Sequence, residues 1–207
     1  MSVIMLNGSP HEKGCTYTAL TIVADELKNQ GISSQIIWLG NNPVRGCIGC
    51  AGCKNTGRCV FDDDAVNAIG EKLKDADGYI FGAAVHYASP NGAMVAAMDR
   101  LFYSHGRYMK NKPAAAVVSA RRAGTTASFD VLNKYIMINN MIMVPSTYWN
   151  MVHGSRPEDV LKDEEGVSVM RAIGSNMAWL IKLLQNAKGT ALEAPVEIPK
   201  ARTNFIR

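Results

Sequence analysis

The sequence predicts an α/β protein with an open, five-stranded parallel sheet that is covered by helices on both faces. Short apolar runs alternate with stretches of helical periodicity from one end of the 207 residues to the other. Each connection between two apolar runs is long enough for a right-handed crossover. No Pro/Ser-rich linker, internal repeat or low-complexity tract interrupts the alternation, so we expect a single core.

Each expected strand is short and apolar, and a loop and a helical stripe follow it. The expected strands cover residues 3–6, 34–39, 79–85, 114–119 and 141–145. The apolar stripes of the helices are Leu20, Val23, Ala24 and Leu27; Val66, Ile69 and Leu73; Met94, Met98 and Leu101; Phe129, Leu132 and Ile136; and, in a long last helix, Met170, Ile173, Met177, Leu180, Ile181 and Leu184. The acidic run at 62–64 favours a capped start for the second of these helices.

Composition and charge exclude several classes of protein. The chain is 47% hydrophobic and 19% charged, and its formal net charge of +4 comes from scattered basic residues. A disordered chain and a nucleic-acid-binding protein are therefore not expected. No apolar run approaches the roughly 18 residues of a membrane span, and the first residues lack the pattern of a cleaved leader. We expect a cytoplasmic protein with neither a nucleic-acid nor a membrane partner.

The loop between the first strand and the first helix, residues 7–18, has the composition of an anion site. The N–H groups of a helix N-terminus and the hydroxyls of Ser9, Thr16 and Thr18 can donate to a phosphate, which the helix dipole also attracts. The loop lacks the Gly-Lys-Ser/Thr ending of a triphosphate loop and the Gly-x-Gly-x-x-Gly spacing of a dinucleotide turn. These differences favour a monophosphate. The alternative is that the hydroxyls only cap the helix.

Two further loops, after the third and fourth strands, should lie at the same edge of the sheet. Together the three loops could hold a phosphate at one end and a planar ring at the other. His86 or Tyr87 would then pack beside the ring, and Arg121 or Arg122 would supply charge. The alternative is ordinary surface packing for the aromatic pair and solvation for the two arginines.

Four of the five cysteines fall within thirteen positions, at Cys47, Cys50, Cys53 and Cys59. This compact spacing is similar to the ferredoxin arrangement, whereas structural zinc usually draws its ligands from two separated turns. Glycines between the cysteines allow a short loop to bend around a cofactor. We expect a [4Fe–4S] cluster, with a zinc site or metal-free thiols and disulfides as the alternatives. Cys15 stands apart, and we expect no nucleophilic role for it.

Several motifs occur in order along the chain: Gly8-Ser9-Pro10 with Gly14-Cys15-Thr16, then Val85-His86-Tyr87-x-Ser89-Pro90-x-Gly92, then Ser146-Thr147-Tyr148-Trp149-Asn150. Together they resemble the NADPH-dependent FMN reductase superfamily of flavodoxin-like proteins. The cysteine spacing resembles its iron–sulfur flavoprotein branch. The resemblance runs from Val3 to about the last helix. It implies a flavodoxin-like three-layer fold with strand order 2-1-3-4-5, bound FMN, and a homodimer or homotetramer.

The resemblance also implies which residues bind the cofactors. The implied FMN-binding residues are Ser9, Cys15, Thr16, Tyr17 and Thr18 at the phosphate, Ala84, Val85, His86, Tyr87 and Asn91 along the isoalloxazine, and Ser119, Ala120, Arg121, Arg122 and Gly124 on the third side. The implied metal ligands are Cys47, Cys50, Cys53 and Cys59. The chain departs from the family pattern at Cys15, Ala84 and His86, where relatives often have Asn, Pro and Tyr. Because a flavin carries the chemistry itself, no catalytic side chain is expected.

The implied function is an FMN-dependent oxidoreductase that takes hydride from NADH or NADPH and passes electrons to a cluster or a small acceptor. The alternatives are an electron carrier reduced by ferredoxin, a cluster-free NADPH-dependent FMN or quinone reductase, and a redox sensor whose cysteines change its oligomeric state. We expect one domain over residues 1–190 with a cysteine-rich insertion at 43–61, followed by an extended tail at 191–207.

Overall fold

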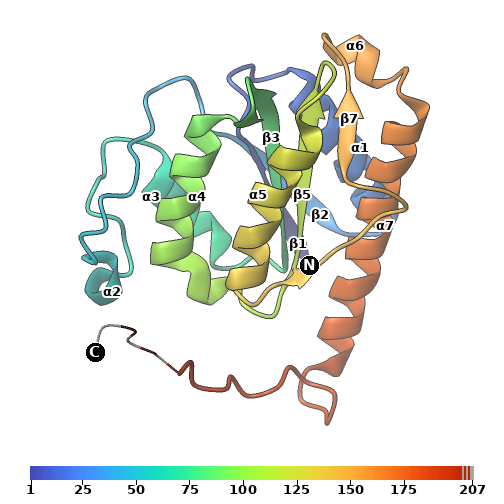
Figure 1. Cartoon of the computed structure of the whole chain (residues 1–207). Helices are drawn as coiled ribbons and strands as arrows, with labels where there is room; N and C mark the ends of the chain where they lie inside the picture. The colour runs from blue at the N-terminus through green and yellow to red at the C-terminus, as the bar shows by residue number, and fades with distance from the viewer. Residues whose placement is uncertain (202, 204, 206–207) are drawn as a thin grey trace.

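A parallel sheet forms the centre of the molecule (Figure 1). The computed structural model describes residues 1–201, 203 and 205. The main path of the sheet has the order β2-β1-β3-β5-β6, and neighbouring strands on it run parallel. These strands are β1 (Ser2–Asn7), β2 (Ser33–Trp38), β3 (Gly78–His86), β5 (Pro113–Ala120) and β6 (Ile142–Met143). Because the strands are parallel, their carboxyl ends share one edge of the sheet.

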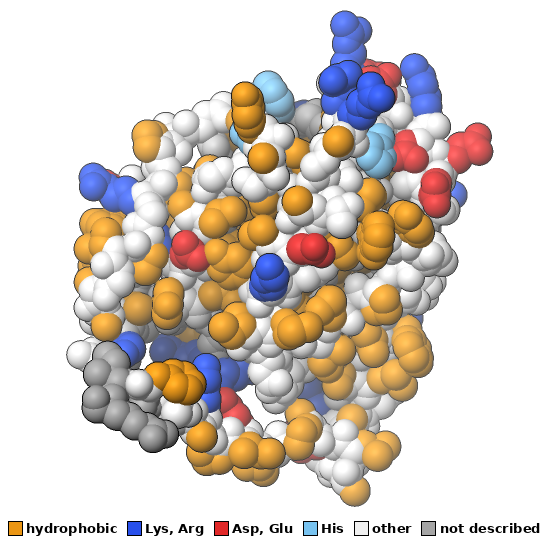
Figure 2. Space-filling model, viewed as in Figure 1, with side chains coloured by type: hydrophobic (Ala, Val, Ile, Leu, Met, Phe, Trp, Pro, Cys, Tyr) orange, Lys and Arg blue, Asp and Glu red, His pale blue; other side chains and the backbone are white. Residues whose placement is uncertain are grey.

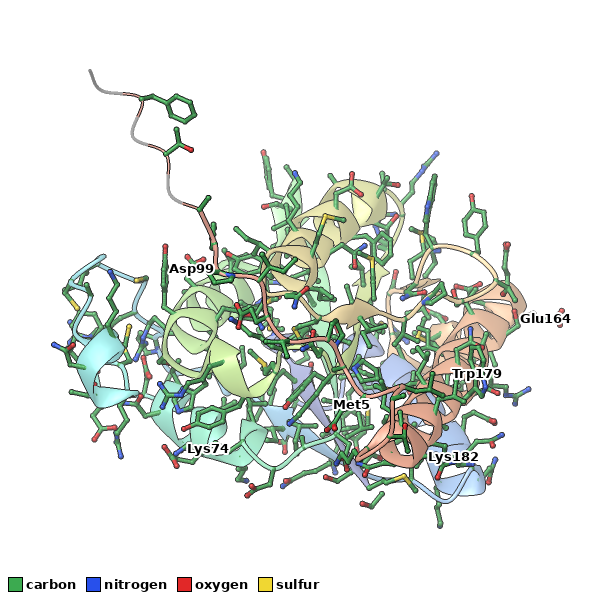
Figure 3. All side chains as sticks on the ribbon, turned by 90° about the horizontal axis from the view of Figure 1, so that it is seen from below. Met5, Lys74, Asp99, Glu164, Trp179 and Lys182 are labelled. Atoms are coloured by element: carbon green, nitrogen blue, oxygen red, sulfur yellow. The ribbon has the colours of Figure 1, made fainter. Side chains whose placement is uncertain are left out.

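The central strands are buried on both faces. Every residue of β5 is buried, and its run of Ala and Val is typical of a parallel strand covered on both sides. Along β1 the side chains alternate between two apolar clusters: Val3 and Met5 belong to one, and Ile4 and Leu6 to the other. Figure 3 shows Met5 near the middle of the molecule, between the helical layers.

Helices cover both faces of the sheet (Figure 1). On the face of Val3 and Met5 lie α1 (Cys15–Asn29) and α7 (Glu164–Ala187). On the opposite face lie α3 (Val66–Leu73), α4 (Gly92–His105) and α5 (Thr125–Ile138). The predicted α/β class, with a parallel sheet between two helical layers, is confirmed.

Three short helices lie in the connections. They are α2 (Cys53–Thr56), the 3-10 helix η1 (Gly106–Tyr108) and α6 (Pro157–Val160). Beyond α7 the described residues contain neither helix nor strand, and this tail contacts the body through Lys110 Nζ, 2.5 Å from a carboxylate oxygen of Glu197. None of the described helices has the length and apolar character needed to cross a membrane.

The predicted count of five strands is wrong, because the sheet has seven strands within the described residues. The five predicted strands keep their relative order, but the added strands change its numbering from 2-1-3-4-5 to β2-β1-β3-β5-β6. One addition is β4 (Ser89–Pro90), a two-residue antiparallel partner of β3. The other is β7 (Met151–His153), which pairs with β5 after the chain has left the sheet beyond β6. The interruption follows Val144, whose N–H still donates to the Ala114 carbonyl and which is followed by Pro145.

Candidate functional site

Three loops meet where β1, β3 and β5 end, and we call this region the carboxyl edge. The Thr16 and Ser119 hydroxyl oxygens lie 2.8 Å apart in a buried hydrogen bond, which joins the first turn of α1 to β5. The Asn91 Nδ2 donates to the Gly8 carbonyl at 2.5 Å, which joins the loop after β3 to the loop after β1. The structure thus brings the three predicted loops together.

The N-terminus of α1 is open at this edge. Its N-cap residue is Gly14, so no side chain accepts a hydrogen bond from the first turn. Within the described residues, the N–H groups of Cys15, Thr16 and Tyr17 have no hydrogen-bond acceptor. Unpaired donors at the positive end of a helix dipole attract a phosphate or another anion.

The hydroxyls of this loop already have partners inside the protein. Thr16 bonds to Ser119, and Thr18 Oγ1 donates to the Gly14 carbonyl at 3.3 Å. The Ser9 Oγ accepts from the His11 N–H at 3.2 Å, and its own hydrogen has no acceptor among the described residues. The donors available to an anion are therefore the backbone N–H groups and the Ser9 hydroxyl. The two threonine hydroxyls, which the composition of the loop suggests as donors, are already bonded within the protein.

The loop after β3 presents an exposed aromatic ring and a buried amide. Tyr87 is fully exposed and has a positive φ of 58°, which is uncommon for a residue with a bulky side chain. His86 is exposed beside it, whereas Ala84 and Val85 are half-buried. Asn91 is only 3% exposed, and its Oδ1 has no hydrogen-bond partner within the described chain. Buried polar atoms are nearly always paired, so this oxygen is suited to accept from a ligand.

The loop after β5 is tied to β3 at Gly124. This residue has a φ of +92°, and a Cβ built on it would lie 2.8 Å from Val85 Cγ1, so glycine is required there on two grounds. Arg121 and Arg122 precede it, are exposed, and form no ion pair with any described residue. Figure 2 shows basic side chains projecting from the upper border of the molecule.

A hollow of about 340 Å³ opens at the carboxyl edge. Its lining includes Gly8, His86 and Asn91 from the predicted loops, but none of residues 119–124. It also includes Asn42 and Val44, which follow β2. The stem that leads into the cysteine-rich insertion therefore borders the site, which the spacing of the motifs alone does not reveal.

The four clustered cysteines line one pocket of about 210 Å³, which we call the cysteine pocket. Cys47 and Cys50 are exposed, Cys53 and Cys59 are half-buried, and all four are free thiols. Burial raises the pKa of Cys53, and the neighbouring thiols of Cys47, Cys50 and Cys59 add to the rise, which reflects how close the four groups lie. In the described residues, no three Cys, His, Asp or Glu side chains are arranged as a formed metal site. The four thiols that the expected cluster needs thus share one pocket, but they are not arranged around a single metal position.

Arg100 of α4 lies beneath this pocket and was missed by the sequence interpretation. Its side chain is fully buried and donates to Cys59 Sγ and to the carboxylate of Asp64. Burial opposes ionisation of Asp64, but the hydrogen bonds from Arg100 and from the Val66 N–H outweigh it and lower the pKa of the carboxyl. The run of acids at 62–64 contains the partner that a buried arginine needs, but nothing in the sequence pairs that run with Arg100. Asp64 Oδ1 also accepts from the Val66 N–H at the start of α3, although the N-cap residue of this helix is Ala65, whose side chain offers no cap.

Comparison with known proteins agrees with this geometry. The family model described as NADPH-dependent FMN reductase matches residues 1–156. An iron–sulfur flavoprotein of Methanocaldococcus jannaschii is 30% identical over 193 residues, which cover 89% of this chain and 100% of that protein. An iron–sulfur flavoprotein of Archaeoglobus fulgidus is 25% identical, with 92% of this chain and 97% of that protein covered.

Solved structures agree on the fold. RosB, solved with a bound 8-demethyl-8-formylriboflavin-5'-phosphate, aligns with a TM-score of 0.72 at 13% identity and covers 100% of this chain and 92% of its own. An archaeal flavodoxin aligns with a TM-score of 0.60 at 13% identity, covering 88% of this chain and 99% of its own. The open α1 terminus, the three convergent loops and the family match lead to one conclusion: the chain belongs to the NADPH-dependent FMN reductase family of flavodoxin-like proteins, in its iron–sulfur flavoprotein branch.

Proposed function

We propose that this flavoprotein takes hydride from NADH or NADPH and passes electrons to an iron–sulfur group in the cysteine pocket or to a small-molecule acceptor. The observation that carries the proposal is the open N-terminus of α1 beside the unpaired, buried Asn91 Oδ1 at the carboxyl edge. An anionic group and a polar planar ring on one ligand would satisfy both features. FMN has both.

The phosphate of FMN would bind at the first turn of α1. The N–H groups of Cys15, Thr16 and Tyr17 would donate to it together with the Ser9 hydroxyl. The Thr18 hydroxyl would not donate to the phosphate, since it donates to the Gly14 carbonyl and so stabilises the first turn of α1. Cys15 would contribute its backbone and not its thiol, because burial raises the pKa of that thiol and keeps it protonated.

The isoalloxazine would lie against the loops after β3 and β5. Bound FMN supplies the chemistry, since its ring accepts a hydride and can release electrons singly. Asn91 Oδ1 would accept a hydrogen bond from the ring. The other residues that would line the ring are Ala84, Val85, His86 and Tyr87 on one side and Ser119, Ala120, Arg121, Arg122 and Gly124 on the other.

Arg121 and Arg122 are suited to the nicotinamide donor. Both are exposed beside the carboxyl edge, and neither is neutralised by a carboxylate of the described chain. Guanidinium groups bind phosphate oxygens in a bidentate manner. We therefore assign them to the phosphates of NADH or NADPH, with the fully exposed Tyr87 available to pack on a planar ring.

The cysteine pocket is suited to a [4Fe–4S] cluster by its donor set. Four thiols from one short segment share the pocket, and thiolates are the ligands that iron–sulfur clusters require. Gly49 has a φ of +65° and Gly57 a φ of +71°, so the segment bends sharply on both sides of α2. The stem of the insertion lines the hollow at the carboxyl edge, so one segment borders both sites.

We also propose a homodimer or homotetramer. α4 and α5 carry large exposed side chains, Tyr103 (71% exposed), Met137 (69%) and Ile138 (79%). Tyr103 and Ile138 border a groove of about 390 Å³ between the two helices. Exposed apolar surface of this kind is typical of subunit contacts. Light scattering at micromolar concentration would give a mass of two or four chains, and a monomer would contradict the proposal.

An anaerobic absorption spectrum, recorded before and after addition of NADPH or NADH, tests the proposed reaction. Flavin bands with a broad brown shoulder that bleach on addition are the expected result. Flavin bands that bleach without the shoulder would support a cluster-free reductase instead. Bleaching by reduced ferredoxin alone would support an electron carrier. A colourless protein that takes up no added FMN would contradict the flavin site.

A further inference from the structure

Arg100 is the most highly connected buried charge in the described part of the molecule. It is 1% exposed, and all five of its N–H donors have acceptors. Nε donates to Cys59 Sγ at 3.0 Å. Nη1 donates to the Arg45 carbonyl at 3.2 Å and to Asp64, and Nη2 donates at 3.0 Å to both the Phe61 carbonyl and Asp64.

These acceptors lie at both ends of the cysteine-rich insertion. Arg45 precedes the first clustered cysteine, whereas Phe61 and Asp64 follow the last. A single side chain from α4 therefore ties the two ends together beneath the cysteine pocket. Lysine could not replace it, because an ammonium group has three donors and lacks the planar fork.

Cys59 receives the only one of these bonds that reaches a candidate ligand atom. Asn67 of α3 holds the same residue through its backbone: Asn67 Oδ1 accepts from the Cys59 N–H at 2.9 Å, and Asn67 Nδ2 donates to the Cys59 carbonyl at 3.0 Å. Asn67 thus orders the segment without touching the sulfur. Arg100 both orders the segment and places a positive charge beside the sulfur.

We propose that Arg100 is a positioning residue for the cysteine pocket, which clasps the insertion and raises the reduction potential of the iron–sulfur group held by Cys59. The inference rests on the proposed function for the identity of that group. Reduction adds negative charge, and a nearby cation and a hydrogen bond to sulfur both stabilise the reduced state. The partner Asp64 offsets part of the cation's charge, so the two residues should act in opposite directions.

Three variants separate this role from a general loosening of the loop. Arg100→Gln removes the charge and the sulfur bond. Asp64→Asn keeps the shape of the carboxylate but leaves the Arg100 charge unopposed. Asn67→Ser loosens the same segment without changing any charge, and is the matched control. Each protein is reconstituted with iron and sulfide under anaerobic conditions, and its midpoint potential is measured by a redox titration that follows the EPR signal of the reduced cluster.

The expected shifts have different signs. Arg100→Gln should make reduction at least tenfold less favourable, which is about 59 mV for a one-electron couple. Asp64→Asn should shift the potential upward, and Asn67→Ser should change the equilibrium by less than about twofold. If all three variants shift in the same direction, or if Arg100→Gln and Asn67→Ser agree, Arg100 is merely structural. If Arg100→Gln does not fold, Asp64→Asn decides: an upward shift of its midpoint potential supports the proposal, and a downward shift or none overturns it.

Hydrogen exchange on the apoprotein tests the clasp without any cluster. Backbone amides of residues 45–61 should exchange at least tenfold faster in Arg100→Gln than in the wild type, while those of β5 should be unchanged. Equal exchange would overturn the clasp. If the wild type takes up no iron and sulfide, the proposed cluster and the effect on its potential fail together, and hydrogen exchange still decides whether Arg100 holds the insertion.

Discussion

The carboxyl edge and the cysteine pocket are built in opposite ways. At the carboxyl edge the scaffold is the sheet itself: backbone and side-chain bonds join β1, β3 and β5 directly, as in the bond from the Gly8 N–H to the Gly82 carbonyl at 2.8 Å. The cysteine pocket lies in an irregular segment whose only helix, α2, has four residues. There the order comes from two polar side chains of neighbouring helices, Arg100 and Asn67.

This difference has a physical consequence. A site built on strand ends is rigid because the packed core fixes its backbone, and its polar groups can be left open for a ligand. A site built on an insertion has no core of its own, so its order depends on a few buried polar contacts, and losing one of them has a large effect. Variants in the two regions should therefore differ in kind as well as in size.

The largest effect is expected from Arg100→Met. The change leaves the Asp64 carboxylate buried without its cation, and breaking a buried pair in this way costs about 3–5 kcal/mol of unfolding free energy. Urea unfolding of the apoprotein measures it. The double variant Arg100→Met/Asp64→Leu removes the stranded charge and should recover most of the loss. A loss below about 1 kcal/mol in the single variant would contradict the buried pair.

The next largest effect is expected at the carboxyl edge, where one substitution should weaken FMN binding and stabilise the apoprotein. Tyr17→Glu adds a negative charge to the open first turn of α1. Repulsion of the phosphate should weaken FMN binding by about 100-fold, whereas the helix dipole should stabilise the apoprotein by about 0.3–1 kcal/mol.

Fluorescence titration with FMN and thermal unfolding measure the two effects of this substitution. Tyr17→Gln is the control, because glutamine has the length of glutamate without its charge. Both effects are measured relative to this variant. Unchanged FMN affinity in Tyr17→Glu would place the phosphate elsewhere.

Acid should loosen the side of the molecule that carries the insertion. His105 of α4 is fully buried against Gly70 of α3, and burial lowers its pKa, although Glu71 opposes the shift and Lys74 and Arg107 add to it. Below about pH 6.5 the unfolded chain binds a proton that the folded chain excludes, so the stabilisation is complete above that pH and is lost as the pH falls toward the lower, folded pKa.

The free energy of unfolding should therefore decrease between about pH 7.5 and pH 5.5. Urea unfolding at the two pH values measures the decrease, and it should be smaller in His105→Gln, which cannot titrate. The same pH dependence in both proteins would rule out His105 as the cause.

The smallest effect is expected from Arg45→Gln, in the same insertion as the contacts of Arg100. Arg45 Nη2 lies 2.9 Å from an Asp63 oxygen, but both side chains are more than half exposed. Exposed ion pairs contribute about 0–1 kcal/mol. The same urea titration should therefore hardly distinguish Arg45→Gln from the wild type, and a loss as large as that of Arg100→Met would show that charge alone, without burial, stabilises the insertion.

The carboxyl edge could be predicted from the sequence because alternating strands and helices bring every loop that follows a parallel strand to one edge. The interruption of the last strand could not be predicted, since the two residues of β6 and the three residues of β7 are too few to show a period. The roles of the loop hydroxyls were also hidden. Thr16 and Thr18 look alike in the sequence, but one bonds across to β5 and the other back to its own helix.

Arg100 could not be predicted because it lies beside the apolar stripe of α4, where an arginine is usually solvated. Only the folded chain brings its guanidinium to residues 45 and 59–64, which are distant in sequence. The grouping of the four thiols, in contrast, could be predicted from the cysteine spacing alone, because residues in one short loop are close in space whatever the rest of the fold.

We propose that one chain carries two separately built redox sites. Flavin, iron and acid-labile sulfide, measured per chain on anaerobically purified protein, test it most directly. The expected result is one FMN and the iron and sulfide of one [4Fe–4S] cluster per chain, with Tyr17→Glu losing FMN alone and Cys59→Ser losing iron and sulfide alone. Loss of both cofactors in each variant, or a wild-type protein that carries neither after reconstitution, would contradict it.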